Sequence, residues 1–150
     1  MSQSLSNILL HIIYSTKQRE ALIDTAIASE LYAYIVATSA AHGSYVRKIG
    51  GIEDHVHILT SLPRTLSVSE LMEQQKKNSS KWIKSKGSKY QAFSWQKGFG
   101  VFSVSESQSE AVSKYIEDQR EHHKKHSYQD EYRLFLKLNN IPFDERYVWD

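Results

Sequence analysis

The segment from Asn7 to Tyr14 reads NILLHIIY, a short and nearly continuous apolar run. Ile and Leu dominate the run, which is typical of a central β-strand that is covered on at least one face. The chain has 150 residues and 40% hydrophobic content, enough for one domain with a core but too little for two independent enzyme domains. We therefore expect a single domain over residues 1–150, built around this strand.

The remaining periodicity predicts three more strands and three helices. We expect strands at 45–49, 55–62 and 99–104, in addition to the first strand at 7–14. Asp24 can cap a first helix that Gly43 ends, and a second helix is expected from Ser67 to about Lys86. The segment 50–54 reads as a tight turn that joins the two middle strands into a hairpin.

A third helix is expected after the last strand. Ser107 and Glu110 have the spacing of a capping box, and the helix that they open can extend to about Lys125. The resulting order β-α-β-β-α-β plus a C-terminal helix predicts an α+β fold of the ferredoxin-like or RRM-like type, with a four-stranded antiparallel sheet. Its two crossover helices cover one face, and we expect the other face to be free for a ligand or single-stranded nucleic acid.

Composition limits the chemistry and the compartment. The chain has no Cys, which excludes disulfides, thiolate metal sites and a cysteine nucleophile. Its net charge is only +2, so a nucleic-acid partner must be met by a local basic patch. The first residues lack the basic start of a secretory signal, and no apolar run approaches the ~20 residues that span a bilayer. We expect a cytoplasmic protein without a membrane partner.

The first candidate site is the sequence Asp54-His55-Val56-His57-Ile58. Because side chains alternate along a strand, His55 and His57 share one face while Val56 and Ile58 point into the core. Two imidazoles side by side on a rigid strand are suited to bind one metal ion. Histidines that are merely satisfied in a core or on a surface show the same pattern, so a third ligand is needed. His11 is interpreted as a core histidine, although a place beside the metal remains open.

The second candidate site is on the last expected helix. Tyr115 and Gln119 are four residues apart, so they share a helical face and reach the same volume. From helical spacing alone, the better interpretation of Tyr115 is a core residue beside Val112 and Ile116. The two weak signals become informative only in combination.

Basic residues give candidates for DNA contact. Those considered are Lys17, Lys77, Lys81, Lys84 and Arg120. Three of these lysines lie on one face of the second expected helix, where a solvated face is as good an interpretation as phosphate contact. Arg120 lies among the cations that end the tyrosine helix, and their interaction with the helix dipole explains them equally well.

Several sequence blocks resemble one family, in the family's order. They are Tyr14 to Lys17, Asp54 to Leu59, Trp95 to Ser105, Tyr115 to Gln119 and Asp144 to Trp149. In these blocks the chain resembles the IS200/IS605-type HUH single-tyrosine transposases, including their REP-associated relatives. The resemblance implies that Tyr115 is the nucleophile and that His55, His57 and Gln119 bind Mg²⁺ or Mn²⁺.

The resemblance also implies a reaction and partners. Such enzymes cleave and rejoin single-stranded DNA through a 5′-phosphotyrosine, recognise DNA hairpins and form homodimers. A metal ion held by neutral imidazoles and an amide keeps more positive charge than one surrounded by carboxylates, so it polarises the scissile phosphate strongly. In a dimer the tyrosine helix, tethered only through residues 105–107, could complete the neighbour's site.

Two alternatives from other classes remain. One is a non-catalytic RRM-like nucleic-acid-binding module, which has no use for a metal triad and whose basic aromatic motif is not evident here. The other is a metal-dependent phosphodiesterase in which His55 and His57 serve to activate water and Tyr115 is structural. A covalent protein–DNA adduct separates the three hypotheses, because only the transposase forms one.

Overall fold

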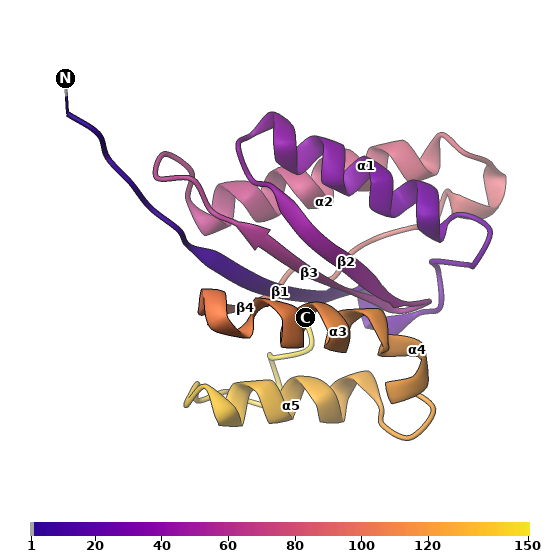
Figure 1. Ribbon diagram of the computed structural model, residues 1–150. Helices are drawn as coiled ribbons and strands as arrows, with labels where there is room; N and C mark the ends of the chain where they lie inside the picture. Colours follow the sequence, from indigo (N-terminus) through magenta and orange to yellow (C-terminus); the bar gives the residue numbers. More distant parts are fainter. Residues whose placement is uncertain (1) are drawn as a thin grey trace.

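The computed structural model describes residues 2–150, and its centre is a four-stranded antiparallel sheet (Figure 1). The strands are β1 (Leu9–Ser15), β2 (Val46–Ile52), β3 (His55–Ser61) and β4 (Gly100–Val104). They lie in the order β2-β3-β1-β4, so β1 and β3 are central, as the apolar run at 7–14 predicts. The α+β fold class with a ferredoxin-like order of elements is confirmed.

The helices form two layers, one on each side of the sheet (Figure 1). The first layer contains α1 (Ala28–Ala41) and α2 (Val68–Lys84), and the second contains α3 (Ser109–Glu117), α4 (Gln119–His122) and α5 (Tyr128–Leu138). The expected free sheet face is therefore wrong, because α3, α4 and α5 cover it. Among residues 2–150, no helix combines the length and the apolar character needed to cross a membrane.

Alternation along the central strands separates the two layers chemically. On β1, Leu10, Ile12 and Tyr14 belong to the large apolar core shared with α1 and α2. The intervening Leu9 and Ile13 belong instead to smaller clusters on the α3 and α5 side. Strand periodicity thus gives the sheet one predominantly apolar face and one face that also buries histidines.

The β2–β3 hairpin is tighter than expected. Residues 50 and 51 lie within β2, and the turn consists of Glu53 and Asp54. Gly50 has a packing role: an added Cβ would lie 2.8 Å from the backbone oxygen of Ile116 on α3. Only glycine therefore permits this close approach of the tyrosine helix to the sheet.

The helix termini follow the sequence in one case and depart from it in another. Ser67 and Glu70 form a reciprocal capping box at the start of α2. The expected box at Ser107 and Glu110 is wrong, because a 3₁₀ turn occupies 106–108 and α3 starts at Ser109 without a side-chain cap. The single helix expected to reach about Lys125 is also interrupted: α3 ends at Glu117 and α4 covers only 119–122.

The helix α5 was not expected from the sequence. The Ser127 hydroxyl caps its first turn by accepting from the Asp130 amide. Its buried residues Tyr128, Tyr132 and Leu136 pack against Ile13 and Phe102 of the sheet. At Gly100 an added Cβ would lie 2.6 Å from the Tyr132 ring, so a glycine again permits close packing of a helix against the sheet.

Candidate metal and nucleophile site

His55 and His57 lie on β3, are fully buried and face the layer of α3, α4 and α5. Each ring is held through its outer nitrogen. His55 Nδ1 is 2.7 Å from Asp54 Oδ1, and His57 Nδ1 is 2.8 Å from His11 Nε2. Partners of this kind orient metal-binding imidazoles in known sites. His11 is therefore a buried core histidine, as expected, and it also supports the histidine pair.

Tyr115 and Gln119 reach the same place from the end of α3 and the start of α4. The helix changes direction at Asp118, whose φ of −89° and ψ of 15° end α3. Gln119 is only 1% exposed, and its Oε1 lies 2.9 Å from His55 Nε2. The Tyr115 ring centre is 5.8 Å from that of His57. The structure thus brings together the four residues singled out as a site in the sequence.

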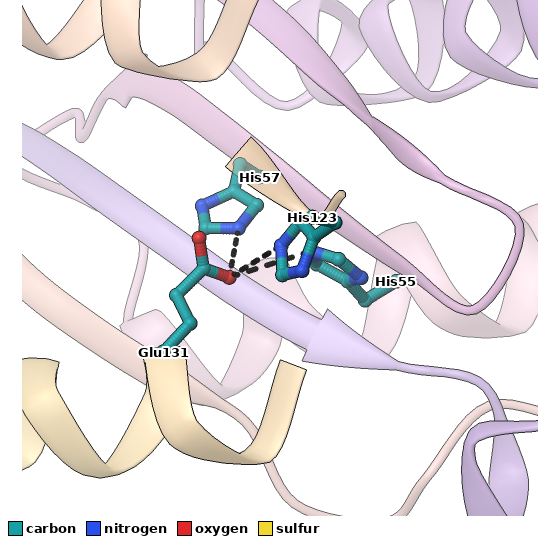
Figure 2. A group of neighbouring side chains, drawn as sticks. All are labelled: His55, His57, His123 and Glu131. Carbon is teal, nitrogen blue, oxygen red and sulfur yellow. Dashed lines mark hydrogen bonds and ion pairs between the residues drawn. The ribbon is translucent and has the colours of Figure 1, made fainter. Parts of the chain in front are cut away.

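Glu131 of α5 lies at the centre of this group. Its Oε1 is 2.9 Å from His57 Nε2 and 3.2 Å from His123 Nε2, two of the contacts drawn in Figure 2. Its Oε2 accepts hydrogen bonds from the Tyr115 hydroxyl and from Gln119 Nε2, the latter at 3.0 Å. One buried carboxylate therefore contacts both the imidazoles and the tyrosine.

The surroundings shift the pKa values of the buried groups in the cluster in different directions. Burial alone would lower the pKa of His55, but hydrogen bonds with Asp54 and Glu131 raise it to about 9. Burial lowers the pKa of His57 to about 4 and that of His11 to about 3. Burial also opposes ionisation of Glu131, yet hydrogen bonds from the histidines hold its pKa well below the usual range. In the absence of metal, an anionic Glu131 thus neutralises a protonated His55.

An open groove of about 660 Å³ reaches the Tyr115 side of the cluster. Its lining consists of Ala111, Lys114, Tyr115, Asp118, Glu121, His122, Lys125 and His126. The Tyr115 hydroxyl also lies 3.3 Å from His122 Nε2. Burial and the neighbouring Glu131 charge raise the Tyr115 pKa above its ordinary value of 10. His55 and His57 are buried, whereas Tyr115 is partly exposed and lines the groove.

The basic residues considered for DNA contact do not form one surface. Those on α2 are Lys77, Lys81 and Lys84. This helix lies on the other side of the sheet from α3 and α4 (Figure 1), the helices that contribute most of the groove lining. Lys17 lines a separate cavity of about 400 Å³ that also includes Trp149. Arg120 is near the cluster in sequence, but its guanidinium donates to Glu53 Oε1 at 3.0 Å. The structure brings none of these five residues into the groove beside Tyr115.

Sequence reasoning missed His123 and Glu131, although both had signals. His123 follows Gln119 by four residues, the same spacing that linked Gln119 to Tyr115. Glu131 lies on the stripe of α5 that buries Tyr128 and Tyr132, and an acid on such a stripe is unusual. The cations after Gln119 are interpreted from the sequence only as partners of the helix dipole or of DNA, which leaves no ligand role for His123. Glu131 lies on a helix that the sequence pattern did not predict.

The donor set fits a metal ion. His55, His57, His123 and Glu131 each offer one ligand atom, and these atoms all lie within 4.8 Å of one another. Three of the four are imidazole nitrogens, the commonest protein ligands of transition metals. Together with the Gln119 oxygen, the cluster has the composition of a metal site.

Comparison with known proteins identifies the family. Residues 4–119 match the family model described as "Transposase IS200 like", and the chain therefore belongs to the IS200-like transposase family. The matched segment includes both strand histidines, Tyr115 and Gln119. It ends before His123 and Glu131. A search of curated proteins found no match.

Two solved structures have the same fold. One is a Deinococcus radiodurans R1 protein described as a "putative transposase", with 20% identity and a TM-score of 0.62 over 79% of this chain and 98% of that one. The other is a REP-associated tyrosine transposase bound to a REP hairpin, with 15% identity and a TM-score of 0.60 over 82% of this chain and 74% of that one. Identities this low establish the shared fold alone.

Proposed function

We propose that this protein is a metal-dependent transposase that cleaves and rejoins single-stranded DNA through a covalent bond to Tyr115. One observation carries the proposal: the Tyr115 hydroxyl lies between an open groove and a buried cluster that includes His55, His57 and Gln119. Family membership supports the same reaction class. Neither alternative requires this arrangement, because a binding module needs no nucleophile and a hydrolase needs no tyrosine at the metal site.

The reaction exchanges one phosphodiester for another. The Tyr115 oxygen attacks the scissile phosphorus, a tyrosine–phosphate bond forms and the bond to the 3′ oxygen breaks. The products are a 5′-phosphotyrosine and a free 3′-OH. Attack by a different 3′-OH reverses these steps and joins new strands without ATP, because the phosphodiester bond energy is retained in the adduct.

The protein's own groups manage the proton. The Tyr115 hydroxyl donates to Glu131 and lies 3.3 Å from His122 Nε2. Burial lowers the pKa of His122, so at neutral pH its imidazole is uncharged and can accept a proton from the hydroxyl. The same imidazole can return a proton when Tyr115 leaves. His122 is therefore the proposed proton acceptor at the groove.

His55, His57 and Gln119 are the proposed ligands for Mg²⁺ or Mn²⁺. When bound, such an ion supplies positive charge that stabilises the phosphate oxygens during the transfer. The outer partners Asp54 and His11 hold the two rings in place. The three proposed ligands and their two hydrogen-bond partners are therefore held in fixed positions on the buried side of the site, where a metal ion could contact the phosphate.

A DNA hairpin at the ends of the mobile element is the proposed substrate. The related REP-associated transposase was solved with a REP hairpin, and the groove beside Tyr115 carries Lys114 and Lys125. These lysines offer phosphate contacts close to the nucleophile. They are better placed than Lys77, Lys81 and Lys84, because α2 lies on the other side of the sheet from α3 and α4. The α2 lysines remain candidates for the distal part of a long substrate.

The decisive experiment is a search for the covalent adduct. The purified chain is incubated with Mn²⁺ and single-stranded oligonucleotides taken from both flanks of its gene, and the products are resolved on a denaturing gel. We expect a protein–DNA band with wild type and none with Tyr115→Phe, while hairpin binding stays intact. Tyr147→Phe, altered at a side chain that is 65% exposed, is the control. Cleavage without an adduct supports the hydrolase, and intact DNA supports the binding module.

A homodimer is also proposed, with the site complete inside each protomer. The structure docks α3 on the sheet of its own chain, where Gly50 contacts the Ile116 backbone. We therefore expect the tyrosine to act in cis. Mixing Tyr115→Phe protein with a His55→Ala, His57→Ala double variant under subunit exchange should then leave cleavage absent. Restored cleavage would show that the tyrosine helix acts in the neighbouring site.

A further inference from the structure

Two of the three imidazoles in the cluster are held so that only Nε2 faces inward. His55 Nδ1 lies 2.7 Å from the Asp54 carboxylate, and His123 Nδ1 lies 2.7 Å from the backbone carbonyl of His126. Carboxylates and carbonyls accept hydrogen bonds, so Nδ1 carries the hydrogen in both rings. Their Nε2 atoms are then the ones available for a metal ion. His123 is oriented as a ligand in the same way as His55.

His57 can adopt the same state. Its Nδ1 is 2.8 Å from His11 Nε2, and a neutral imidazole offers one donor and one acceptor. His11 can therefore accept from His57 Nδ1 and leave His57 Nε2 free. Three Nε2 atoms from two different parts of the chain thus point at one volume.

The oxygen donors lie at ligand spacing. Glu131 Oε1 is 2.9 Å from His57 Nε2 and 3.2 Å from His123 Nε2, and Gln119 Oε1 is 2.9 Å from His55 Nε2 and 3.0 Å from His123 Nε2. Adjacent ligands at about 2.1 Å from an octahedral ion are about 3.0 Å apart. The cluster therefore needs little rearrangement to surround an ion.

We propose that His123 and Glu131 are additional ligands of the metal ion held by His55, His57 and Gln119, and that Glu131 also holds the Tyr115 hydroxyl. The family model ends at residue 119, so both ligands come from a segment outside the matched region. The metal part of the proposal stands on the cluster alone. Only the role of Tyr115 rests on the proposed function.

The fold explains how α5 can deliver Glu131 reproducibly. Tyr128 and Tyr132 flank it on the buried stripe and pack with Phe102, and Gly100 lets Tyr132 approach β4 closely. Glu131 itself is 3% exposed. A carboxylate buried at this cost is normally paired or bound to metal, and here its two oxygens face different partners. Oε1 faces the imidazoles, and Oε2 faces the nucleophile.

The donor set also predicts which ions bind. Mg²⁺ prefers an octahedron of oxygen ligands and keeps several waters. Three imidazole nitrogens, one carboxylate oxygen and one amide oxygen suit Mn²⁺, Co²⁺ or Zn²⁺ better. We therefore expect this chain to bind Mn²⁺ and Co²⁺ at least about 100-fold more tightly than Mg²⁺, an order of preference that follows ligand type.

Two roles for Glu131 predict opposite changes in metal affinity when its negative charge is removed. If its carboxylate only neutralises the histidines while the metal is absent, Oε1 blocks the ion. Removing the negative charge would then leave metal affinity unchanged or increase it. If Glu131 is a ligand, the same change must weaken binding. Glu131→Gln preserves the size of the side chain and so separates the two roles.

The experiment is a titration of the full chain with Co²⁺ and Mn²⁺, followed by visible absorption and calorimetry without DNA. We expect Glu131→Gln and His123→Ala each to lower affinity by about 10-fold to 100-fold or more, the scale of losses at metal sites. Glu73→Gln, altered at an exposed position of α2 away from the cluster and the groove, is the matched control. Circular dichroism without metal checks folding, and if Glu131→Gln does not fold, His123→Ala decides. Unchanged or tighter binding overturns the proposal.

The proposed contact between Glu131 and Tyr115 is tested by measuring adduct formation with DNA. At saturating Mn²⁺, Glu131→Gln should still form the Tyr115 adduct about 10-fold more slowly, on the scale expected for a lost positioning contact. Wild-type rates at saturation would overturn the link to Tyr115. If wild type forms no adduct at all but the Co²⁺ affinities change as expected, the proposed function fails and the five-ligand site stands.

Discussion

The two faces of the sheet differ in what they bury. The face toward α1 and α2 holds Ile12, Tyr14 and Ile58 in an apolar core, whereas the face toward α3 to α5 buries His11, His57 and Glu131. Neighbouring residues of one strand contribute to the two faces: Ile58 packs in the apolar core, and His57 is a proposed metal ligand on the other face. The comparison shows that one strand can stabilise the fold and carry the site because its side chains alternate.

The first test of this difference between the two faces removes a residue from the polar face. His57→Ala should reduce cleavage more than about 100-fold, because the side chain is a proposed metal ligand. Hairpin binding should stay within about twofold, since phosphate and base contacts are spread over the surface. Adduct rates and gel shifts measure the two effects. Full cleavage by wild type in excess chelator would remove metal from the mechanism.

The second test removes the adjacent residue on the apolar face. Ile58→Ala should lower the free energy of unfolding by about 2–5 kcal/mol, because it leaves a cavity in a fully buried core. Below the unfolding transition, Mn²⁺ affinity should remain within about twofold of wild type. Urea denaturation and calorimetry give the two values. A large loss of metal affinity in the folded variant would show that the faces are coupled.

A third test addresses the contact that positions α5. Gly100→Ala places a Cβ 2.6 Å from the Tyr132 ring, so α5 must shift, at a cost of about 1–3 kcal/mol for overpacking. Metal affinity should fall with it, because Glu131 is on the same helix. Ser103→Ala, at an exposed position of β4, is the control. Unchanged stability and metal affinity would mean that α5 does not depend on this contact.

A last test concerns the dependence of stability on pH in the metal-free protein. The raised pKa of His55, about 9 against an ordinary 6.5, contributes stability below pH 6.5 that is lost as pH rises through 9. The lowered pKa values of His57 and His11, about 4 and about 3, contribute stability above pH 6.5 that is lost as pH falls. Both trends predict a maximum near pH 6.5.

Melting temperatures measured in chelator between about pH 3 and pH 9.5 check this maximum. His55→Gln should flatten the alkaline side of the profile, because it removes the group that releases the proton there. Acidification below the ordinary pKa of Glu131 should destabilise the protein further, since its carboxylate is ionised in the fold. A melting temperature that rises from pH 6.5 to 9 would contradict the assignment to His55.

Local sequence patterns predicted much of the fold. The apolar run at 7–14, the alternation at 55–58 and the helical pattern that starts at Ser67 are local signals, and each corresponds to an observed element. The errors arose where a local signal competed with packing. Residues 50 and 51 look like turn glycines, yet Gly50 lies in β2 because α3 packs there. The Ser107 and Glu110 spacing imitates a cap that a 3₁₀ turn replaces.

The sequence alone determined which nearby residues of the candidate site share a face: His55 with His57 at strand spacing, and Tyr115 with Gln119 at helical spacing. What only the tertiary structure decided is that α5 covers the second sheet face and places Glu131 between these pairs. The reason is physical. A period fixes which side chains share a face, but the docking of a distant helix depends on side-chain packing and close contacts, such as those at Gly50 and Gly100, which no local pattern specifies.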